Sequence, residues 1–560
     1  MNRTSVSPPA STRPRAVAVR ALGLAALAAS ACSLSQNGVT PPGDTFFFPT
    51  SAIMSPTDTA GDWLYVANSN ADLRFNDGTL VMVNVGMRTD AGTTSGAAFD
   101  RTQDWEQCPQ EDYVNPLPRS DKPICCRDLL DSNIINCDER LYVAADATVS
   151  IGSFAAGMVW QPYCPLPDGS YQDPCISSQG CLADPKAGRL LIGVRGDTSL
   201  TDVDVVPATT SRPAFHCTGG PALTPTLAAC DQKVQDTLSD ATVLAENLPL
   251  SAANPPSVAL PDEPYALTLD PTQGFLYVGH LVGSSSVQNS GGVSLFAVGA
   301  LSNVPAGAFP PPPDFVAPFG GPFPANSSGL FGVTNLHMHE PLGSGPGSQK
   351  TVFASSRYVP LVSSMTTIGP QICMFNPTST GITSSSNQDE VLVPAGDTLN
   401  SGLVGSEMRG VEFIDPAKND PNPPPYAQRV FGLQRVPPDL VGFDISKSQS
   451  GATTVIPTDV TETCSSPTFL YQNDAGEGPR LFVNCFDTGE VYVFDPSIPS
   501  LISTLMVGRG PAGMVFDATR PIAYVLNFTQ NNLVVVDLAP GSPTQYHVVQ
   551  RLGFPTVTPR

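Results

Sequence analysis

Short apolar runs separated by polar turns dominate the chain after residue 45. The runs at residues 63–68 and 275–280 combine Tyr and Val with Leu, and the run at residues 533–538 is almost continuously apolar. Runs of this length, enriched in β-branched and aromatic residues, are typical of strands that are covered on both faces. Pro and Gly punctuate the connections between them, and both residues interrupt helices and central strands. The pattern therefore predicts many short β-strands and no long amphipathic helix.

One part of this pattern recurs over a long distance. Residues 151–160 are similar to residues 507–516, and both contain the sequence Ala-Gly-Met-Val. Each copy is followed by an apolar strand that opens on a basic residue, Arg189 or Arg520, and then by an alternating strand. Self-similarity of this kind indicates a repeat architecture. Seven copies can be placed, and they begin near residues 48, 155, 264, 330, 409, 467 and 511.

Each copy predicts a four-stranded antiparallel sheet that is too small to bury its own faces. Neighbouring sheets must then stack around an axis, which favours a single β-propeller of about seven blades, with six or eight blades as alternatives. The propeller would span residues 46–560, and in the first copy the fourth strand is expected within residues 140–151. Long insertions interrupt it near residues 86–137, 160–187 and 207–261. The segments 45–48 and 551–555 look like two halves of one crossover, so we expect them to lie side by side.

Three tetrapeptides at equivalent places in their copies carry a family resemblance. They are Tyr-Val-Leu-Asn at residues 524–527, Tyr-Val-Ala-Asn at 65–68 and Tyr-Val-Gly-His at 277–280. These resemble the Tyr-Val-Thr-Asn repeat of the YVTN β-propeller family, over the strands from about residue 46 to residue 555 but not over the loops. The resemblance implies the propeller fold and says almost nothing about chemistry. The third position is never Thr here, which leaves the number of blades open.

Composition narrows the classes of partner. The chain of 560 residues is 41% hydrophobic, which is enough to bury a large core and argues against disorder. It carries 28 basic and 50 acidic residues, for a net charge of −22. Such a charge repels phosphate backbones and anionic lipid headgroups, so no nucleic-acid partner is expected.

The first 31 residues form a unit of their own. A leader with four Arg residues precedes an apolar run at residues 21–31, which is typical of a secretory signal and too short to span a bilayer. The sequence Ala-Ser-Ala before Cys32 resembles a bacterial lipoprotein box, which predicts lipidation of Cys32 and a flexible tether over residues 32–45. The protein would then be held in the cell envelope by its lipid alone, at the outer membrane in preference to the inner one. Cleavage without lipidation, and secretion, is the alternative.

The cysteine count agrees with this prediction. There are 13 cysteines, so lipidation of Cys32 would leave an even number for disulfides in an oxidising compartment. Most of them lie in the insertions, where a loop without its own core gains most from cross-linking. Their pairing is left open, and a metal site is the alternative role. The candidates are Cys108, Cys125, Cys126, Cys137, Cys164, Cys175, Cys181, Cys217, Cys230, Cys373, Cys464 and Cys485.

Two segments could hold a metal ion, although each has a simpler interpretation. His337 and His339 would share one face of a strand, with Glu340 beside them, but a two-point site is weak and a strand-edge role is favoured. Residues 68–72 space oxygen ligands as calcium loops do, yet the loop lacks the Gly and the bidentate Glu of an EF-hand. A hairpin turn is therefore favoured there, and no cofactor is predicted.

No catalytic motif accompanies the repeat. The sequence favours a monomeric, non-catalytic propeller that binds or scaffolds an envelope protein or an extracellular ligand at the ends of its channel, with the insertions of the first two copies as specificity elements. The alternative is an envelope enzyme with a site at the channel mouth, either a lactonase or a quinone-dependent dehydrogenase. That alternative follows from fold analogy alone.

Overall fold

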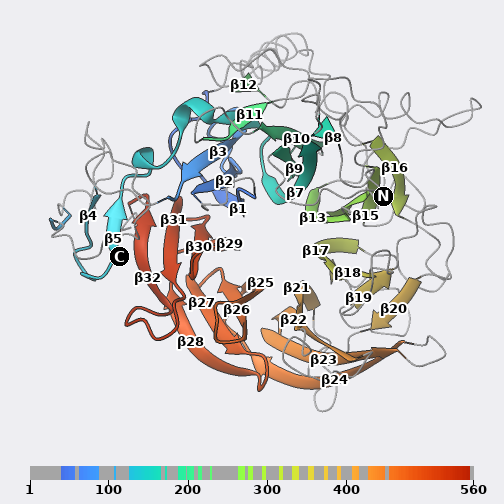
Figure 1. The fold of residues 1–560 in the computed structure, drawn as a ribbon. Coiled ribbons are helices and arrows are strands. Elements are labelled where there is room, and N and C mark those ends of the chain that lie inside the picture. Colours follow the sequence, from blue (N-terminus) through green and yellow to red (C-terminus); the bar gives the residue numbers. More distant parts are fainter. Residues whose placement is uncertain are drawn as a thin grey trace, which may run out of the picture.

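The strands of the protein form a ring of antiparallel sheets around a central axis (Figure 1). This computed structural model describes residues 39–56, 62–86, 106–108, 125–165, 171–172, 187–196, 199–206, 212–216, 228–229, 263–270, 275–281, 293–297, 314–319, 331–339, 351–358, 371–375, 388–392, 406–414, 427–447 and 453–554. Within these residues the strands form seven sheets, which we call blades 1 to 7. The fold class predicted from the sequence is thereby confirmed.

Blades 1 and 2 each have one strand added to the basic four, and blade 3 has none. Blade 1 consists of β1 (Pro49–Met54), β2 (Trp63–Asn68), β3 (Gly78–Asn84), β6 (Val149–Ile151) and β12 (Ala228–Ala229). Blade 2 consists of β7 (Ala155–Pro165), β9 (Ala187–Val194), β10 (Ser199–Val206) and β11 (Ala214–His216), with β8 (Tyr171–Gln172) paired to β7. Blade 3 consists of β13 (Pro264–Asp270), β14 (Phe275–His280), β15 (Val293–Ala297) and β16 (Asp314–Phe319).

Blades 4 to 6 are simple four-stranded sheets. Blade 4 consists of β17 (Phe331–His339), β18 (Thr351–Tyr358), β19 (Gln371–Phe375) and β20 (Gln388–Leu392). Blade 5 consists of β21 (Ser406–Ile414), β22 (Ala427–Val436), β23 (Asp439–Lys447) and β24 (Thr453–Glu462). Blade 6 consists of β25 (Pro467–Asp474), β26 (Pro479–Cys485), β27 (Glu490–Asp495) and β28 (Ser500–Met506).

Blade 7 closes the ring and is wider than the others. It consists of β29 (Pro511–Phe516), β30 (Ile522–Asn527), β31 (Asn532–Asp537) and β32 (His547–Leu552), and it is extended by β5 (Ile135–Cys137) and β4 (Cys125–Arg127). Between β5 and β6 lie two short 3-10 helices, η1 (Glu139–Leu141) and η2 (Ala145–Ala147). Neither of these, nor any other helix in the described part of the chain, has the length and apolar character needed to cross a bilayer.

The core lies between the blades, as the apolar strand pattern predicts. Every residue of β2, β9 and β31 is buried, whereas the outermost strand β28 is mostly exposed. One cluster joins Leu64 and Val66 of blade 1 to Leu526 and Val535 of blade 7. Burying apolar surface on both faces of each middle strand is what stabilises the ring.

The repeated Ala-Gly-Met-Val sequence has a packing role. Gly157 and Gly513 stand at equivalent places on the inner strands β7 and β29. A Cβ atom at Gly157 would lie 2.6 Å from the carbonyl oxygen of Tyr265 on the next inner strand, and one at Gly513 would lie 2.9 Å from that of Thr50. Glycine therefore lets adjacent inner strands approach closely around the axis.

The basic residues that open the second strands anchor their blades. The Arg189 guanidinium is buried and lies 2.8 Å from Asp204 and 3.3 Å from Asp202. Arg520 bonds Asp517 through Nη2 at 2.5 Å, and its Nη1 donates to the carbonyl oxygen of Val85 in blade 1. The shared feature of the two copies is thus a paired guanidinium, since a buried charge requires a partner.

The two ends of the propeller meet, as expected from the sequence, because Phe46 and Leu552 belong to one apolar cluster. The backbone N–H of Phe48 donates to Oδ1 of Asn531 at 2.7 Å, and the rings of Phe48 and Phe528 are 5.0 Å apart between centroids. Blade 1 therefore packs directly on blade 7. The predicted fourth strand of the first copy is shorter than residues 140–151, because η1 and η2 occupy part of that segment and β6 is the strand that pairs with β3.

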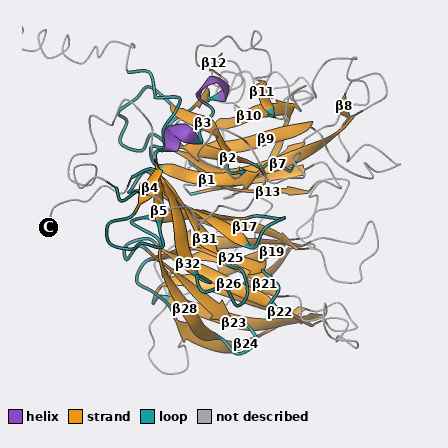
Figure 2. Cartoon of the chain, turned by 60° about the vertical axis from the view of Figure 1, so that its left-hand side comes forward, coloured by secondary structure: helices purple, strands orange, loops and turns teal. Residues whose placement is uncertain are grey.

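The first insertion has an architectural role that the sequence did not predict. It leaves blade 1 after β3, crosses to blade 7 and adds β5 in parallel to β32, with Asn136 opposite Arg551 (Figures 1 and 2). We call its described segments, residues 106–108 and 125–137, the clasp. The prediction that this insertion is a specificity element stays untested. A deletion of residues 90–136 would not test it alone, because it would also remove β4 and most of β5 from blade 7.

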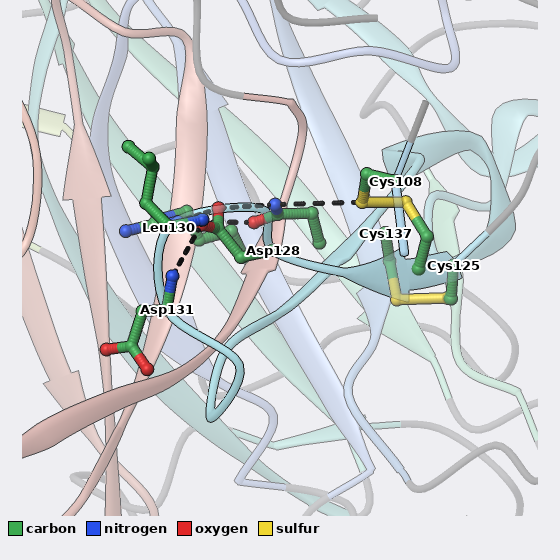
Figure 3. Close-up of a disulfide and its surroundings, with 9 residues drawn as sticks. Cys108, Cys125, Asp128, Leu130, Asp131 and Cys137 are labelled. Atoms are coloured by element: carbon green, nitrogen blue, oxygen red, sulfur yellow. Dashed lines mark hydrogen bonds and ion pairs between the residues drawn. A yellow bond between two sulfur atoms is a disulfide. The ribbon is translucent and has the colours of Figure 1, made fainter. Parts of the chain in front are cut away.

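Two disulfides and an ion pair hold the clasp (Figure 3). Cys108 bonds Cys126, and Cys125 bonds Cys137. Asp128 turns the chain between β4 and β5 by accepting hydrogen bonds from the backbone N–H groups of Leu130 and Asp131. Its other oxygen lies 2.9 Å from Nη1 of Arg551 on β32. The segment therefore has covalent bonds within itself and polar bonds to the last blade.

Candidate functional site in the central channel

A cavity of about 470 Å³ lies on the axis of the ring. Six of the seven inner strands line it: β1, β7, β13, β17, β25 and β29. Figure 1 shows these strands facing the centre of the ring. The lining is mainly apolar, with Leu267, Leu336 and Met514 among its members, and it includes the polar side chains of Ser51, Asn335 and Arg195. Ligand pockets combine such an apolar surface with a few polar groups.

The inner strands place equivalent residues at the same level of the ring because they share one irregularity. In each blade the pairing of the inner strand with its neighbour shifts near its start, between Pro49 and Ser51 in blade 1 for example. The fourth residue after the start of this shift occupies an equivalent position in every inner strand. These positions are Ile53, Val159, Thr268, His337, Glu412, Tyr471 and Val515. They form one layer of the ring. Tyr471 lines the cavity, whereas Ile53, Val159 and Val515 pack against the apolar clusters between neighbouring blades.

Three neighbouring members of this layer form a polar arc. We call these residues the polar arc; they are His337 of blade 4, Glu412 of blade 5 and Tyr471 of blade 6. Nδ1 of His337 lies 3.8 Å from Oε2 of Glu412, and the ring of His337 lies 5.0 Å from that of Phe413. The side chain of His337 is 29% exposed and that of Glu412 is 18% exposed. Tyr471 itself lines the cavity.

Burial changes the acid–base properties of the polar arc. It raises the pKa of the Glu412 carboxyl to about 8, although a hydrogen bond from the backbone of Phe413 opposes the shift. Burial also raises the pKa of the Tyr471 hydroxyl; a backbone hydrogen bond from Met514 opposes this, and the charges of Tyr265 and Glu412 add to it. A carboxyl group with a raised pKa therefore lies near Tyr471, which lines the cavity.

A second charged group lies across the ring. Arg195 follows β9 and lines the cavity, with its guanidinium 5.7 Å from the ring centroid of Tyr265. Its Nη2 lies 2.8 Å from Oε2 of Glu263. The charge of Arg195 is thus largely balanced where it meets the channel.

Two polar atoms of lining residues lack a hydrogen bond. Among the described residues, Oγ of Ser51 and Oδ1 of Asn335 are buried and make no hydrogen bond to the protein. An unmade hydrogen bond at a buried group is costly. Because both atoms are closed to solvent, a molecule in the channel can bond them only after the two side chains rotate.

The histidine pair found in the sequence is only partly brought into this site. His337 and His339 both lie on β17, and His337 joins the polar arc, whereas Glu340 lies outside the described residues. Its acidic partner is instead Glu412, which comes from the next blade. Over the part of the chain that the structure describes, no three His, Cys, Asp or Glu side chains are grouped as metal ligands.

The calcium-like loop at residues 68–72 is a turn. Asn68 donates to Oγ1 of Thr79 at 2.9 Å, and its Oδ1 accepts from the backbone of Phe47. Asn70 bonds the backbone of Phe75 through both its amide atoms. The hairpin interpretation is confirmed, since these oxygens and amides bind the chain itself.

Among the described residues, six of the candidate cysteines form disulfides. Besides the two pairs of the clasp, Cys464 bonds Cys485 in blade 6. Cys164 and Cys373 lie on β7 and β19. Cys32, Cys175, Cys181, Cys217 and Cys230 lie outside the described residues. The prediction of structural cross-links is confirmed for the described pairs.

Sequence reasoning missed Glu412, Tyr471 and Arg195 as members of a site. Glu412 is an acidic residue between the apolar residues Val411 and Phe413, and that was the available signal. A charged residue in a strand that is buried on both faces is costly unless it is paired and hydrogen-bonded, so such a residue indicates a partner from another strand.

Comparisons with known proteins support no family for this chain. No protein-family profile matches it, and no curated protein does either. Among solved structures, hydrazine synthase of Kuenenia stuttgartiensis is similar at 12% identity and a TM-score of 0.40, over 92% of this chain and 99% of that chain. The periplasmic gluconolactonase PpgL of Pseudomonas aeruginosa is similar at 14% identity and a TM-score of 0.38, over 72% of this chain and 98% of that one. Similarities this distant transfer no activity, and membership of the YVTN family stays a prediction.

Proposed function

We propose that this protein is a non-catalytic, ligand-binding β-propeller of the bacterial cell envelope, with the central channel as its binding site. The observation that carries the proposal is the axial cavity of about 470 Å³, which six inner strands line. Ligand pockets commonly have volumes of roughly 300–1,000 Å³. The wall is mainly apolar and includes the polar side chains of Ser51, Asn335 and Arg195, which is the combination that orients a small molecule.

The proposal is tested by filling the channel. Ser51→Phe places an aromatic ring in the cavity, whereas Ser500→Phe places the same ring on the exposed outer strand β28. A small-molecule library is screened against the wild type by ligand-observed NMR. We expect binders that Ser51→Phe loses and Ser500→Phe keeps. If every binder is retained by Ser51→Phe, the channel is not the site.

The envelope location and anchor are part of the proposal. Lipidation of Cys32, after removal of residues 1–31, would tether the propeller through residues 32–45 to the membrane. Labelled palmitate should then enter the wild type but not Cys32→Ser, and globomycin should block processing of the wild type alone. Palmitate incorporation that persists in Cys32→Ser would exclude this anchor.

A second candidate function is hydrolysis, for example of a lactone. It is favoured by one observation, the contact of 3.8 Å between His337 and Glu412 beside the cavity. A carboxyl group whose pKa is about 8 is suited to general acid–base catalysis near neutral pH. Turnover of a lactone panel that disappears in Glu412→Gln, with melting temperature unchanged, would replace the binding function by this one.

A further inference from the structure

The outer edges of blades 1 and 7 share one addition. In blade 7, β5 pairs in parallel with β32, and Cys137 lies opposite Leu552. In blade 1, β12 pairs in parallel with β6, and Ala228 lies opposite Val149. Leu552 and Val149 are equivalent, because each pairs with the residue that faces the third position of the Tyr-Val-x-Asn tetrapeptide in its blade. Two blades therefore accept a parallel strand at the same level of their outer edge, and in both an insertion supplies that strand.

The corresponding edge of blade 6 has no such addition among the described strands. β28 is the last strand of its sheet, and Figure 1 shows it on the outer rim of the ring. The pairing of β28 with β27 skips Ile502, as the pairing of β32 with β31 skips Val549. Leu505 and Leu552 each follow the skipped residue by three positions. Residues 503–505 of β28 are therefore equivalent to the part of β32 that binds β5.

The side chains of β28 favour the addition of a strand. The strand contains no charged residue, and most of its residues are exposed. Its exposed large hydrophobic side chains are Leu501, Ile502 and Met506. Charged residues and Pro protect edge strands from pairing with other chains. β24, the outer strand of blade 5, carries Pro457 and Glu462, whereas β28 has neither kind of protection.

The backbone of β28 is oriented to form the ladder. The N–H of Val507 donates to the carbonyl oxygen of Gly489, at the β27 side of the strand. Because the backbone groups of successive residues point to opposite sides of a strand, the N–H groups of Thr504 and Met506 point away from β27. Gly553 has the position of Met506 in blade 7, and its N–H donates to the carbonyl oxygen of the last residue of β5 at 2.8 Å. The same donors are therefore presented at the edge of blade 6.

We propose that the outer edge of β28 is a docking site for an extended, mainly apolar segment of another protein, which adds to blade 6 as a parallel fifth strand and carries Lys or Arg beside its apolar residues. Strand addition of this kind is a common mode of peptide recognition. The basic residues follow from charge, since Glu490 and Asp495 lie opposite the two ends of β28 and the chain has a net charge of −22. That charge attracts a basic segment and repels a second copy of this chain. The inference goes beyond the proposed function, because it does not involve the channel.

The probe is a labelled peptide, Lys-Lys-Ile-Ile-Asn-Val-Lys-Lys, whose core contains the Ile-Ile-Asn sequence of residues 134–136 in the clasp. Its binding to the full-length protein is measured by fluorescence anisotropy. We expect it to bind at least tenfold more tightly than the same peptide with Glu in place of every Lys. Two further peptides are N-methylated on alternate core residues. A parallel strand uses the N–H groups of alternate residues toward one neighbour, so one of these peptides should lose at least tenfold in affinity and the other should keep it.

A pair of matched variants locates the site on β28. Thr504→Pro removes an N–H group that points away from β27, and it should weaken binding of the lysine peptide at least tenfold. Val460→Pro is the control, because Val460 has the same position on β24, two residues after the skipped Thr458, and it should bind as wild type. Proline is tolerated on edge strands where the N–H faces solvent. If Thr504→Pro nevertheless fails to fold, the two N-methylated peptides decide the matter with the wild type.

Several results would overturn the inference. Equal binding of the two N-methylated peptides would show that no strand is added, and so would the absence of any binding at about 1 mM lysine peptide. Equal binding of the lysine and glutamate peptides would exclude a basic partner. A dimer of the wild type in sedimentation that Thr504→Pro dissociates would assign the edge to a second copy. None of these results bears on the channel function, which Ser51→Phe tests separately.

Discussion

The junction between blades 7 and 1 differs from the junction between blades 5 and 6, although both join equivalent inner strands. At the second junction the chain runs directly from β24 into β25, and Cys464 beside β25 bonds Cys485 at the end of β26. At the first, residues from opposite ends of the chain meet through Phe48, Asn531 and the clasp. The comparison shows that strands borrowed from an insertion take the place of a peptide link where the ring closes.

Breaking a disulfide of the clasp should have the largest effect. Cys125→Ser with Cys137→Ser should lower the free energy of unfolding by about 2–4 kcal/mol, because the cross-link restricts the unfolded chain. Hydrogen exchange should show faster opening of β32. Cys464→Ser with Cys485→Ser is the control, and it should cost a similar amount while β32 stays protected. Undiminished protection of β32 without the clasp bond would contradict a role in closure.

Removing the ion pair between Asp128 of the clasp and Arg551 of blade 7 should have the next largest effect. Arg551→Met leaves Asp128, whose side chain is only 5% exposed, without its cation, and should cost about 2 kcal/mol in urea unfolding. Arg74→Met is the matched control, because the pair of Arg74 with Asp72 is largely solvent-exposed, and it should change stability by less than about 0.5 kcal/mol. Equal effects of the two substitutions would show that the clasp does not depend on this contact.

Acid should weaken the same contact between the clasp and blade 7. Burial alone would raise the pKa of Asp128, but hydrogen bonds from Asn136, Leu130 and Asp131, with the charge of Arg551, bring it below the ordinary value of 3.8. A lowered pKa means that the stabilisation is complete above about pH 4 and is lost as the pH falls through the folded-state value. The stability difference between wild type and Asp128→Asn, measured in urea at pH 6 and pH 3, should therefore shrink at pH 3. A constant difference would disprove the linkage.

The smallest effect is expected at the hydrogen bond between Phe48 and Asn531. Asn531→Gly removes the acceptor of the Phe48 N–H bond and keeps the backbone relaxed, because Asn531 has a φ of 54° that glycine adopts freely. We expect a loss of about 1 kcal/mol in thermal or urea unfolding. A loss of stability as large as that of the clasp disulfide variant would show that the ring closes mainly through the contact of Phe48 with Asn531 and not through the clasp.

The sequence was sufficient for the parts of the fold that repeat. The second and third strands of the copies, such as β2 and β31, are buried on both faces and therefore keep a continuous apolar pattern. The clasp could not be predicted in this way. β4 and β5 are each three residues long, and β32, the partner of β5, lies more than four hundred residues away, so no local period marks them.

The site was less predictable than the fold. His337 was identified because it forms a pair with His339 in the sequence, yet its partner in the structure is Glu412. That contact depends on two inner strands from different blades having the same register shift. Such alignment is a property of the assembled ring, and neither strand contains a motif that reveals it.

The clasp also constrains the order in which the molecule can be made. β5 is synthesised early, but Asn136 meets Arg551 only after another 415 residues have followed. Until then its edge is open, and open strand edges invite pairing with other chains. A truncated product that lacks β32 would keep this edge exposed, so quality-control proteases should distinguish it from the finished protein.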